Sequence, residues 1–357
     1  MNALVTPDGR SAVEFATAGS DTELTWHDLT TGVGSAPTRI AGTLTATALD
    51  PNAQIVALTA TPAPGHTEIV IAGADGERFR RTYDAELLPE GFANAWESTE
   101  LPIGLFVIEY LDRSTGLTGP RTYQVRVIDL LTGDLRLPLN LRNKGETVDE
   151  QMTGFARTHV TSERDGLLFT LYRGVNSDDS NYAFVHTLGF VNGVWCLDVP
   201  AELGLDQLPG GLALAPDGSR LFVGSANGMV AEYVVDDILN PDRLPVAART
   251  SRAVASDATG VGAPALALTD DELILAGPSQ INWLSRDDLT ISAAVKWPDR
   301  VEALIATPNQ TVLIATSGRL SHVGRDGEIR VQLDLPVDIG PVTQLITLDE
   351  MGDGASG

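Results

Sequence analysis

Histidine is the residue type in this chain best suited to acid–base or metal chemistry. The chain has five histidines, at His27, His66, His159, His186 and His322. No two of them stand two or four residues apart, the spacing that puts two ligands on one face of a strand or helix. His186 lies in an apolar run, which predicts a packed core histidine. His159 follows Arg157 in a run that can form a strand, so it is the better candidate for a binding role.

Hard oxygen ligands, the kind that Ca²⁺ prefers, gather in the segment Arg173–Asn181. The candidate ligands there are Asp178, Asp179 and Asn181. The segment lacks the ligand spacing and the closing bidentate Glu of an EF-hand loop. A solvated hairpin loop is therefore the favoured interpretation, and Ca²⁺ binding is the alternative.

No sequence motif predicts a catalytic residue or a cofactor. The segment Gly224–Gly228 misses the register of the Gly-x-Ser-x-Gly nucleophile motif, and Asn227-Gly228 favours a hairpin turn instead. Phosphate-binding and dinucleotide-binding glycine motifs do not occur. Cys196 is the only cysteine, which excludes an internal disulfide and a cysteine-based zinc site.

The net charge of the chain is −24, from 48 acidic and 24 basic residues. A field of this sign repels phosphate groups, which argues against nucleic acid and anionic membrane surfaces as partners. No window is apolar enough to cross a bilayer, and the start Met1–Pro7 carries no leader pattern, so we expect no direct membrane insertion. A cytosolic protein and a mature envelope domain both fit these features.

A fold built from a repeated unit can bring side chains that are far apart in the sequence together, and one pattern does recur. An alternating apolar run, a turn of Pro, Asp or Gly and a second apolar run are clearest in Gly211–Gly224. Period-two alternation on both sides of such a turn predicts a β-hairpin. Other copies turn near residues 7, 51, 101, 165, 270 and 309.

A second hairpin pattern follows each copy of the first, and Val125–Leu135 shows it best. The Asp129 carboxylate can accept a hydrogen bond from the backbone two residues on, and Gly133 supplies a positive φ. Two hairpins make the four strands of one propeller blade. We therefore predict an all-β fold, a β-propeller of seven four-stranded blades, in a single domain of residues 1–349 with a flexible Gly/Asp-rich tail at 350–357.

Both ends of the chain have the pattern of an innermost strand, at Ala3–Thr6 and at Gly340–Asp349. A final strand that completes the first blade abolishes an exposed sheet edge, so we predict that the C-terminal strand closes the ring. The two ends compete for one position in this scheme. Helical periodicity is weak and is best at Asp84–Leu88 and Val235–Leu239.

The segments Val127–Gly133 and Pro216–Val223 resemble the bacterial YVTN/YncE-like seven-bladed propellers. Phe184–Leu188 and Asn192–Pro200 are similar to segments of uncharacterised propellers from actinobacterial cell-envelope proteins. The resemblance implies a WD40-like repeat of bacterial origin and favours an extracytoplasmic location over a cytoplasmic one. The Gly-His and Trp-Asp signature of eukaryotic WD40 repeats is missing, so its hydrogen-bond network is not implied.

The repeats with the greatest spacing are the third and fourth. Their extra residues fall in Asp112–Thr122, Asn140–Gly154 and Arg173–Asn181. Insertions on a repeat scaffold tend to cluster on the binding face, although tolerated length variation in loops is the alternative. The binding-face candidates are Arg121, Arg173, Asp178 and His159, the last of which would line the central channel.

These observations favour a non-enzymatic binding or scaffold propeller that presents one face, or its channel mouth, to a protein or small-molecule partner. The alternative is a lactonase-like hydrolase or a quinoprotein-associated subunit with a site at one end of the channel. An enzyme needs at least three side chains of His, Glu, Asp or Asn in contact there. A scaffold needs a channel lined by small or apolar side chains.

Overall fold

The computed structural model describes most of the strands that the repeat predicts. The described residues are 2–6, 10–50, 52–93, 104–112, 121–137, 151–162, 167–175, 180–189, 193–208, 210–215, 217–240, 246, 248–252, 265–269, 271–276, 280–297, 301, 303–306, 312–316 and 319–334. All statements about structure below concern these residues.

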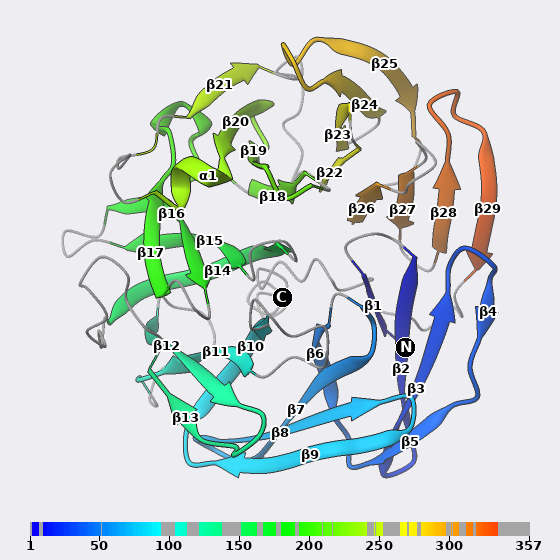
Figure 1. Cartoon of the computed structure of the whole chain (residues 1–357), viewed down its shortest axis with the longest axis vertical. Helices are drawn as coiled ribbons and strands as arrows, with labels where there is room; N and C mark the ends of the chain where they lie inside the picture. Colours follow the sequence, from blue (N-terminus) through cyan, green and yellow to red (C-terminus); the bar gives the residue numbers. More distant parts are fainter. Residues whose placement is uncertain are drawn as a thin grey trace, which may run out of the picture.

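The described strands form six antiparallel sheets arranged in a ring, which confirms the β-propeller (Figure 1). The eight-stranded sheet divides into blades 3 and 4, so the ring has seven blades. Blade 1 contains β1 (Asn2–Val5), β2 (Ser11–Ala18), β3 (Asp21–Asp28), β4 (Val33–Gly34) and β5 (Thr38–Ala41), with β4 and β5 both paired to β3. Blade 2 contains β6 (Thr45–Leu49), β7 (Ile55–Ala63), β8 (His66–Gly73) and β9 (Gly76–Tyr83). Blade 3 contains β10 (Glu86–Ala93), β11 (Gly104–Tyr110), β12 (Arg121–Asp129) and β13 (Leu135–Arg136). Blade 4 contains β14 (Met152–Ser162), β15 (Leu167–Val175), β16 (Asn181–Gly189) and β17 (Gly193–Asp198).

The other three blades are more compact. Blade 5 contains β18 (Gly210–Leu214), β19 (Arg220–Ser225), β20 (Met229–Val234) and β21 (Arg249–Arg252). Blade 6 contains β22 (Ala265–Leu268), β23 (Glu272–Ala276), β24 (Gln280–Ser285) and β25 (Ile291–Lys296). Blade 7 contains β26 (Ala303–Ala306), β27 (Val312–Thr316), β28 (Arg319–Val323) and β29 (Ile329–Asp334).

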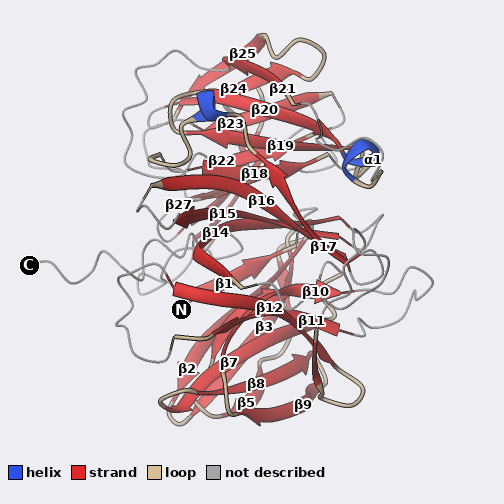
Figure 2. Ribbon diagram, turned by 90° about the vertical axis from the view of Figure 1, so that its left-hand side faces the viewer, coloured by secondary structure: helices blue, strands red, loops and turns tan. Residues whose placement is uncertain are grey.

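The helical content of the described chain is limited to η1 (Ala201–Leu203) and α1 (Val235–Ile238), both visible in the side view (Figure 2). The short helix expected near Val235 is therefore confirmed. The one expected at Asp84–Leu88 is wrong, because β10 begins there and pairs with β11. None of the described helices is long and apolar enough to cross a membrane.

Asp side chains stabilise the tight turns as the sequence predicts. Asp129 Oδ1 accepts the backbone N–H of Leu131 at 2.9 Å, and Gly133 has a φ of 76°. Asp28 Oδ1 does the same for Thr30 at 2.8 Å. A short polar side chain that replaces a backbone acceptor fixes the turn, and the turn then sets the register of both strands.

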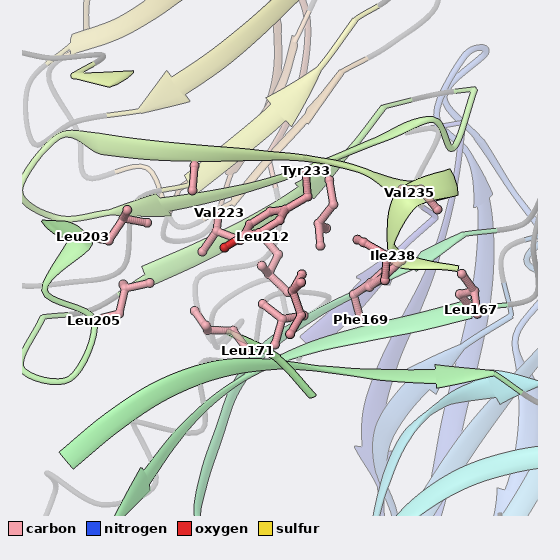
Figure 3. Close-up of a cluster of buried hydrophobic side chains, with 14 residues drawn as sticks. Leu167, Phe169, Leu171, Leu203, Leu205, Leu212, Val223, Tyr233, Val235 and Ile238 are labelled. Atoms are coloured by element: carbon pink, nitrogen blue, oxygen red, sulfur yellow. The ribbon is translucent and has the colours of Figure 1, made fainter. Parts of the chain in front are cut away.

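The core lies between neighbouring blades, where alternate side chains of facing sheets interlock. Between blades 4 and 5, Phe169 and Leu171 of β15 meet Leu212 and Val223 of blade 5 (Figure 3). We call this contact the blade 4/5 interface. Trp283 is fully buried between blades 6 and 7.

Blade 1 has its own inner strand, because β1 pairs with β2 from Asn2↔Phe15 to Val5↔Ala12. The position claimed by both ends of the chain is therefore taken by the N-terminal segment. The segment 340–349 and the tail 350–357 lie outside the described residues, so ring closure by the C-terminal strand stays a prediction.

Candidate functional site

Charged and titratable side chains on the described inner strands occur only in blades 3 and 4. Glu86 and Glu90 belong to β10, and Arg157 and His159 belong to β14. The inner strands of the other five blades consist of small, apolar or hydroxyl side chains and one amide, Asn2. Chemistry near the ring axis is thus concentrated where blades 3 and 4 meet.

Blades 3 and 4 are joined by backbone hydrogen bonds into one eight-stranded sheet. The first residues of β14 pair with the start of β12, from Arg121↔Gly154 to Tyr123↔Met152, before β14 continues as the inner strand of blade 4. Gly154 has a φ of 157°, and a Cβ there would lie 2.3 Å from the carbonyl oxygen of Arg173. Only glycine fits this crossing without strain.

Arg121 ties the start of β12 to β10. Its guanidinium binds the Glu86 carboxylate through both Nη atoms, and Nη2 also donates to the Asp112 carbonyl at 2.9 Å. The guanidinium carbon lies 3.9 Å from the centre of the Tyr110 ring. Only 9% of the Arg121 side chain is exposed, so this binding-face candidate is engaged in contacts within blade 3.

Glu90 crosses from blade 3 to blade 4 and is 2% exposed. Its Oε2 accepts hydrogen bonds from Thr170 Oγ1 at 2.7 Å and from the Tyr172 hydroxyl at 3.3 Å. Burial raises the pKa of the Glu90 carboxyl to about 7, against the two hydrogen bonds that lower it. A buried carboxyl without a cation favours its neutral form, and neutral hydroxyl donors only partly offset that preference.

Two histidines lie in the same row of blade 4, the fully buried His186 and the half-buried His159. His159, Thr170, His186 and Cys196 are consecutive cross-strand partners on β14 to β17, which puts their side chains on one face of the sheet. Burial lowers the pKa of His159 to about 4 and that of His186 to about 3. His186 is fully buried as predicted, and within the described structure neither of its ring nitrogens has a hydrogen-bond partner.

A stack of aromatic rings runs along the same face. Tyr123 of blade 3 stacks on Tyr172 at 5.1 Å between ring centres, and Tyr172 stacks on Phe184 at 5.4 Å. Phe184 stacks on Tyr182 at 5.5 Å, and Tyr182 is 38% exposed. We call these four residues the aromatic stack. It begins in the interior and ends at the surface.

The remaining sequence candidates do not join this group. Arg173 is on β15 but alternates with Tyr172, so it belongs to the face that packs toward blade 5. Asn181 begins β16 opposite Val175, and Asp178 and Asp179 lie outside the described residues. Over the described part of the chain, no three His, Cys, Asp or Glu side chains are placed to hold a metal ion. The solvated loop favoured for this segment, and Ca²⁺ binding as its alternative, therefore both stay predictions.

Glu90 is the functional candidate that sequence reasoning missed, and it brings His159 into a polar group with Thr170 and His186. Of these side chains, Thr170 is the one that donates a hydrogen bond to Glu90. Glu90 and His186 are at most 2% exposed, so a substrate has no open path to them in this structure.

A surface pocket of about 560 Å³ lies between blades 1 and 2 and was also missed. Trp26 and His27 of β3 line it together with Asn52 and Ala53. Trp26 Nε1 donates to the Ala53 carbonyl at 2.9 Å, which holds the ring in place. Because its walls come from two blades, no single stretch of sequence indicates the pocket.

No protein-family model matches the chain, and no curated protein matches it in sequence.

Solved structures do match it over nearly its whole length. The β-propeller domain of Cps50 (Swd1) from Myceliophteria thermophila is 10% identical with a TM-score of 0.50, over 92% of this chain and 94% of that one. Sqt1 of Saccharomyces cerevisiae is 9% identical with a TM-score of 0.57, over 94% and 85%. An uncharacterized protein of Listeria monocytogenes is 9% identical with a TM-score of 0.56, over 96% and 95%. At these identities the similarity shows the fold alone, which is that of a β-propeller.

Proposed function

We propose that the chain is a non-enzymatic binding propeller and that its binding face is the rim of blades 3 and 4. This blade 3/4 rim is defined by strand ends that lie at one edge of the joined sheet: Tyr110, Arg121, Met152, Val175 and Asn181. The observation that carries the proposal is the aromatic stack, which opens to the surface at this rim through Tyr182.

The lengths of the connecting segments support a binding face at the same edge of the sheet. The connections from β11 to β12, from β13 to β14 and from β15 to β16 span residues 111–120, 137–151 and 176–180. At the corresponding edge of blades 1 and 2, β2 to β3 and β7 to β8 are joined by Gly19–Ser20 and Pro64–Gly65. Long connections over a rigid scaffold are where binding residues usually lie.

The exposed tyrosine at the rim and the net charge of the whole chain favour a protein partner with a positively charged contact surface. Tyrosine is enriched in protein interfaces because a large rigid ring loses little entropy on binding. The charge of −24 speeds the approach of a cationic partner and disfavours an anionic one. A cationic small molecule that stacks on Tyr182 is the other outcome of the test.

A photo-crosslinking residue at position 182 tests this face in living cells. Position 131 is the matched control, because Leu131 is 84% exposed and lies at the opposite end of β12. We expect a crosslinked partner from position 182 only. The purified partner should then bind Tyr182→Ala at least about tenfold more weakly than wild type, as for an interface anchor, and Leu131→Ala as wild type. Equal crosslinking from both positions, or equal affinity of both variants, contradicts the proposal.

A finer assignment rests on sequence resemblance. We propose that the chain is a bacterial YVTN/YncE-like propeller that works outside the cytoplasm, supported by Val127–Gly133 and Pro216–Val223. Fractionation of cells that carry the native gene tests the location. Recovery in the cytoplasmic fraction alone contradicts it.

A further inference from the structure

Among the side chains that the structure describes, those around Glu90 offer it hydrogen bonds but no positive charge. Over the described residues it takes part in no ion pair, and its pKa carries no contribution from a cation. The guanidinium of Arg121 in the same blade is bound to Glu86 and rests on the Tyr110 ring. A buried carboxylate that has only neutral hydrogen-bond donors destabilises the folded protein. Release of the Glu90 proton must therefore change the contacts around this side chain.

The groups that face Glu90 come from every strand packed around it. Thr170 and Tyr172 come from β15, and both donate hydrogen bonds to Glu90. Tyr110 comes from β11 and Tyr123 from β12. His159 and His186 lie beside Thr170 in the same row of blade 4. Burial, and then the charge of Glu90, raise the pKa of Tyr110 to about 12. The same two causes hold the pKa of Tyr123 and Tyr172 well above the ordinary value. Both histidines are neutral at pH 7, so Glu90 is the group that titrates there.

Both hydrogen bonds of Glu90 cross between blades. The carboxyl belongs to blade 3, and the hydroxyls of Thr170 and Tyr172 belong to blade 4. Tyr172 is also the second ring of the aromatic stack. A change in the Glu90 charge therefore acts on the packing of the two blades and on the column of rings that reaches Tyr182.

We propose that Glu90 is a proton-controlled contact between blades 3 and 4. The neutral carboxyl holds the two blades in the packed arrangement described above, and its ionisation loosens their junction. This inference depends on the buried contacts alone and not on the proposed binding face.

The sign of the effect follows from linkage. The ordinary pKa of 4.5 is raised to about 7, so between these values the folded protein holds a proton that the unfolded chain releases. The Glu90 contribution to stability is complete below about pH 4.5 and is lost as the pH rises to about 7. The buried histidines act in the opposite direction on acidification, so only a comparison with a Glu90 variant isolates the effect.

Glu90→Gln is the central variant, because an amide has the shape of the neutral acid and cannot ionise. We compare the two proteins by the ratio of their unfolding equilibrium constants, wild type over Glu90→Gln. We expect this ratio to increase with pH by up to about tenfold per pH unit and to level off above about pH 7. Equilibrium denaturation at several pH values measures this ratio. A ratio that does not change between about pH 5 and about pH 8 overturns the proposal.

Glu232→Gln in blade 5 is the matched control. Glu232 is 5% exposed, but Arg220 Nη1 lies 2.9 Å from its carboxylate and the Arg249 guanidinium also binds it. Because two cations neutralise this carboxylate, its replacement should change the unfolding constant by the same factor at every pH in the range. A Glu232→Gln ratio that rises with pH as the Glu90→Gln ratio does contradicts the assignment to Glu90.

Two measurements on wild type keep the test independent of how well the variants fold. The infrared carbonyl band of a protonated carboxylic acid should be present in the folded protein below neutral pH and vanish above it. Hydrogen exchange, corrected for the intrinsic effect of pH, should accelerate in β10 and β15 over the same range while β18 and β19 stay unchanged. Absence of the band, or uniform exchange across all four strands, overturns the proposal.

Discussion

The two faces of blade 4 are made by the same strand and differ in kind. On β15, Phe169 and Leu171 point to blade 5 and meet apolar partners alone. Thr170 and Tyr172 point the other way, to Glu90 of blade 3. Successive side chains of one strand thus point to opposite faces of the sheet. One face makes an apolar contact that stabilises the fold at any pH, and the other makes a contact with a titratable group. The difference shows how a repeat fold can carry a sensitive contact without loss of its core.

The largest effect should come from the apolar face. Phe169→Ala removes a fully buried ring from the blade 4/5 interface, and we expect the free energy of unfolding to fall by about 3–5 kcal/mol. Chemical denaturation at pH 6 and pH 8 measures the loss. The comparison of the two faces predicts the same loss at both values, and a loss that depends on pH would break it.

On the polar face, His186→Phe should protect the protein from acid. The pKa of the buried imidazole is about 3, below its ordinary 6.5, so the unfolded chain takes up a proton first and wild type loses stability as pH falls below about 6.5. At about pH 5 the phenyl ring should recover about 2 kcal/mol, while near pH 8 this gain disappears. Replacement of His66, whose side chain is 42% exposed, is the control and should leave the acid limb unchanged.

A smaller effect distinguishes two threonines of blade 4. Thr170→Val keeps the shape and removes the 2.7 Å hydrogen bond to Glu90, at a cost of about 1 kcal/mol. Thr187→Val is the control, because the Thr187 hydroxyl is buried and has no partner among the described residues, and removal of such a group is neutral or stabilising. Equal losses for both variants would contradict the role of Glu90.

The smallest effect on stability belongs to the outer end of the aromatic stack. Tyr182→Ala should change the free energy of unfolding by less than about 1 kcal/mol, since the ring is 38% exposed. Thermal unfolding measures this, and affinity for the partner measures the larger effect on binding. A severe loss of stability would make Tyr182 a core residue and leave the proposed face without its main support.

Local signals predicted the propeller because its turns are local. Asp28, Asp129 and Asp217 each bind backbone or side-chain groups within three residues, so their chemistry is visible in a short window. The helix expected at Asp84–Leu88 was wrong for the opposite reason. The periodicity there is ambiguous over five residues, and pairing with β11 decides in favour of a strand.

The candidate site was predictable only in part. His186 was correctly expected to be packed, because Val185 and Thr187 already indicate a buried strand. Glu90 was not found, since its burial depends on Thr170, 80 residues away in the chain. An acidic residue in an apolar run, as in Leu87–Phe92, is the one signal that pointed to it. The surface pocket between blades 1 and 2 could not be predicted for the same reason, because Trp26 and Ala53 come from different blades.

The crossing of β14 between two blades also bears on how this molecule can be re-engineered or can diverge. In a ring whose blades meet only through side chains, one repeat can be duplicated, deleted or exchanged as a module. Here Gly154 carries one strand into both blades, so a cut between them breaks backbone pairs on each side. Blades 3 and 4 should therefore be gained, lost and transplanted as a pair.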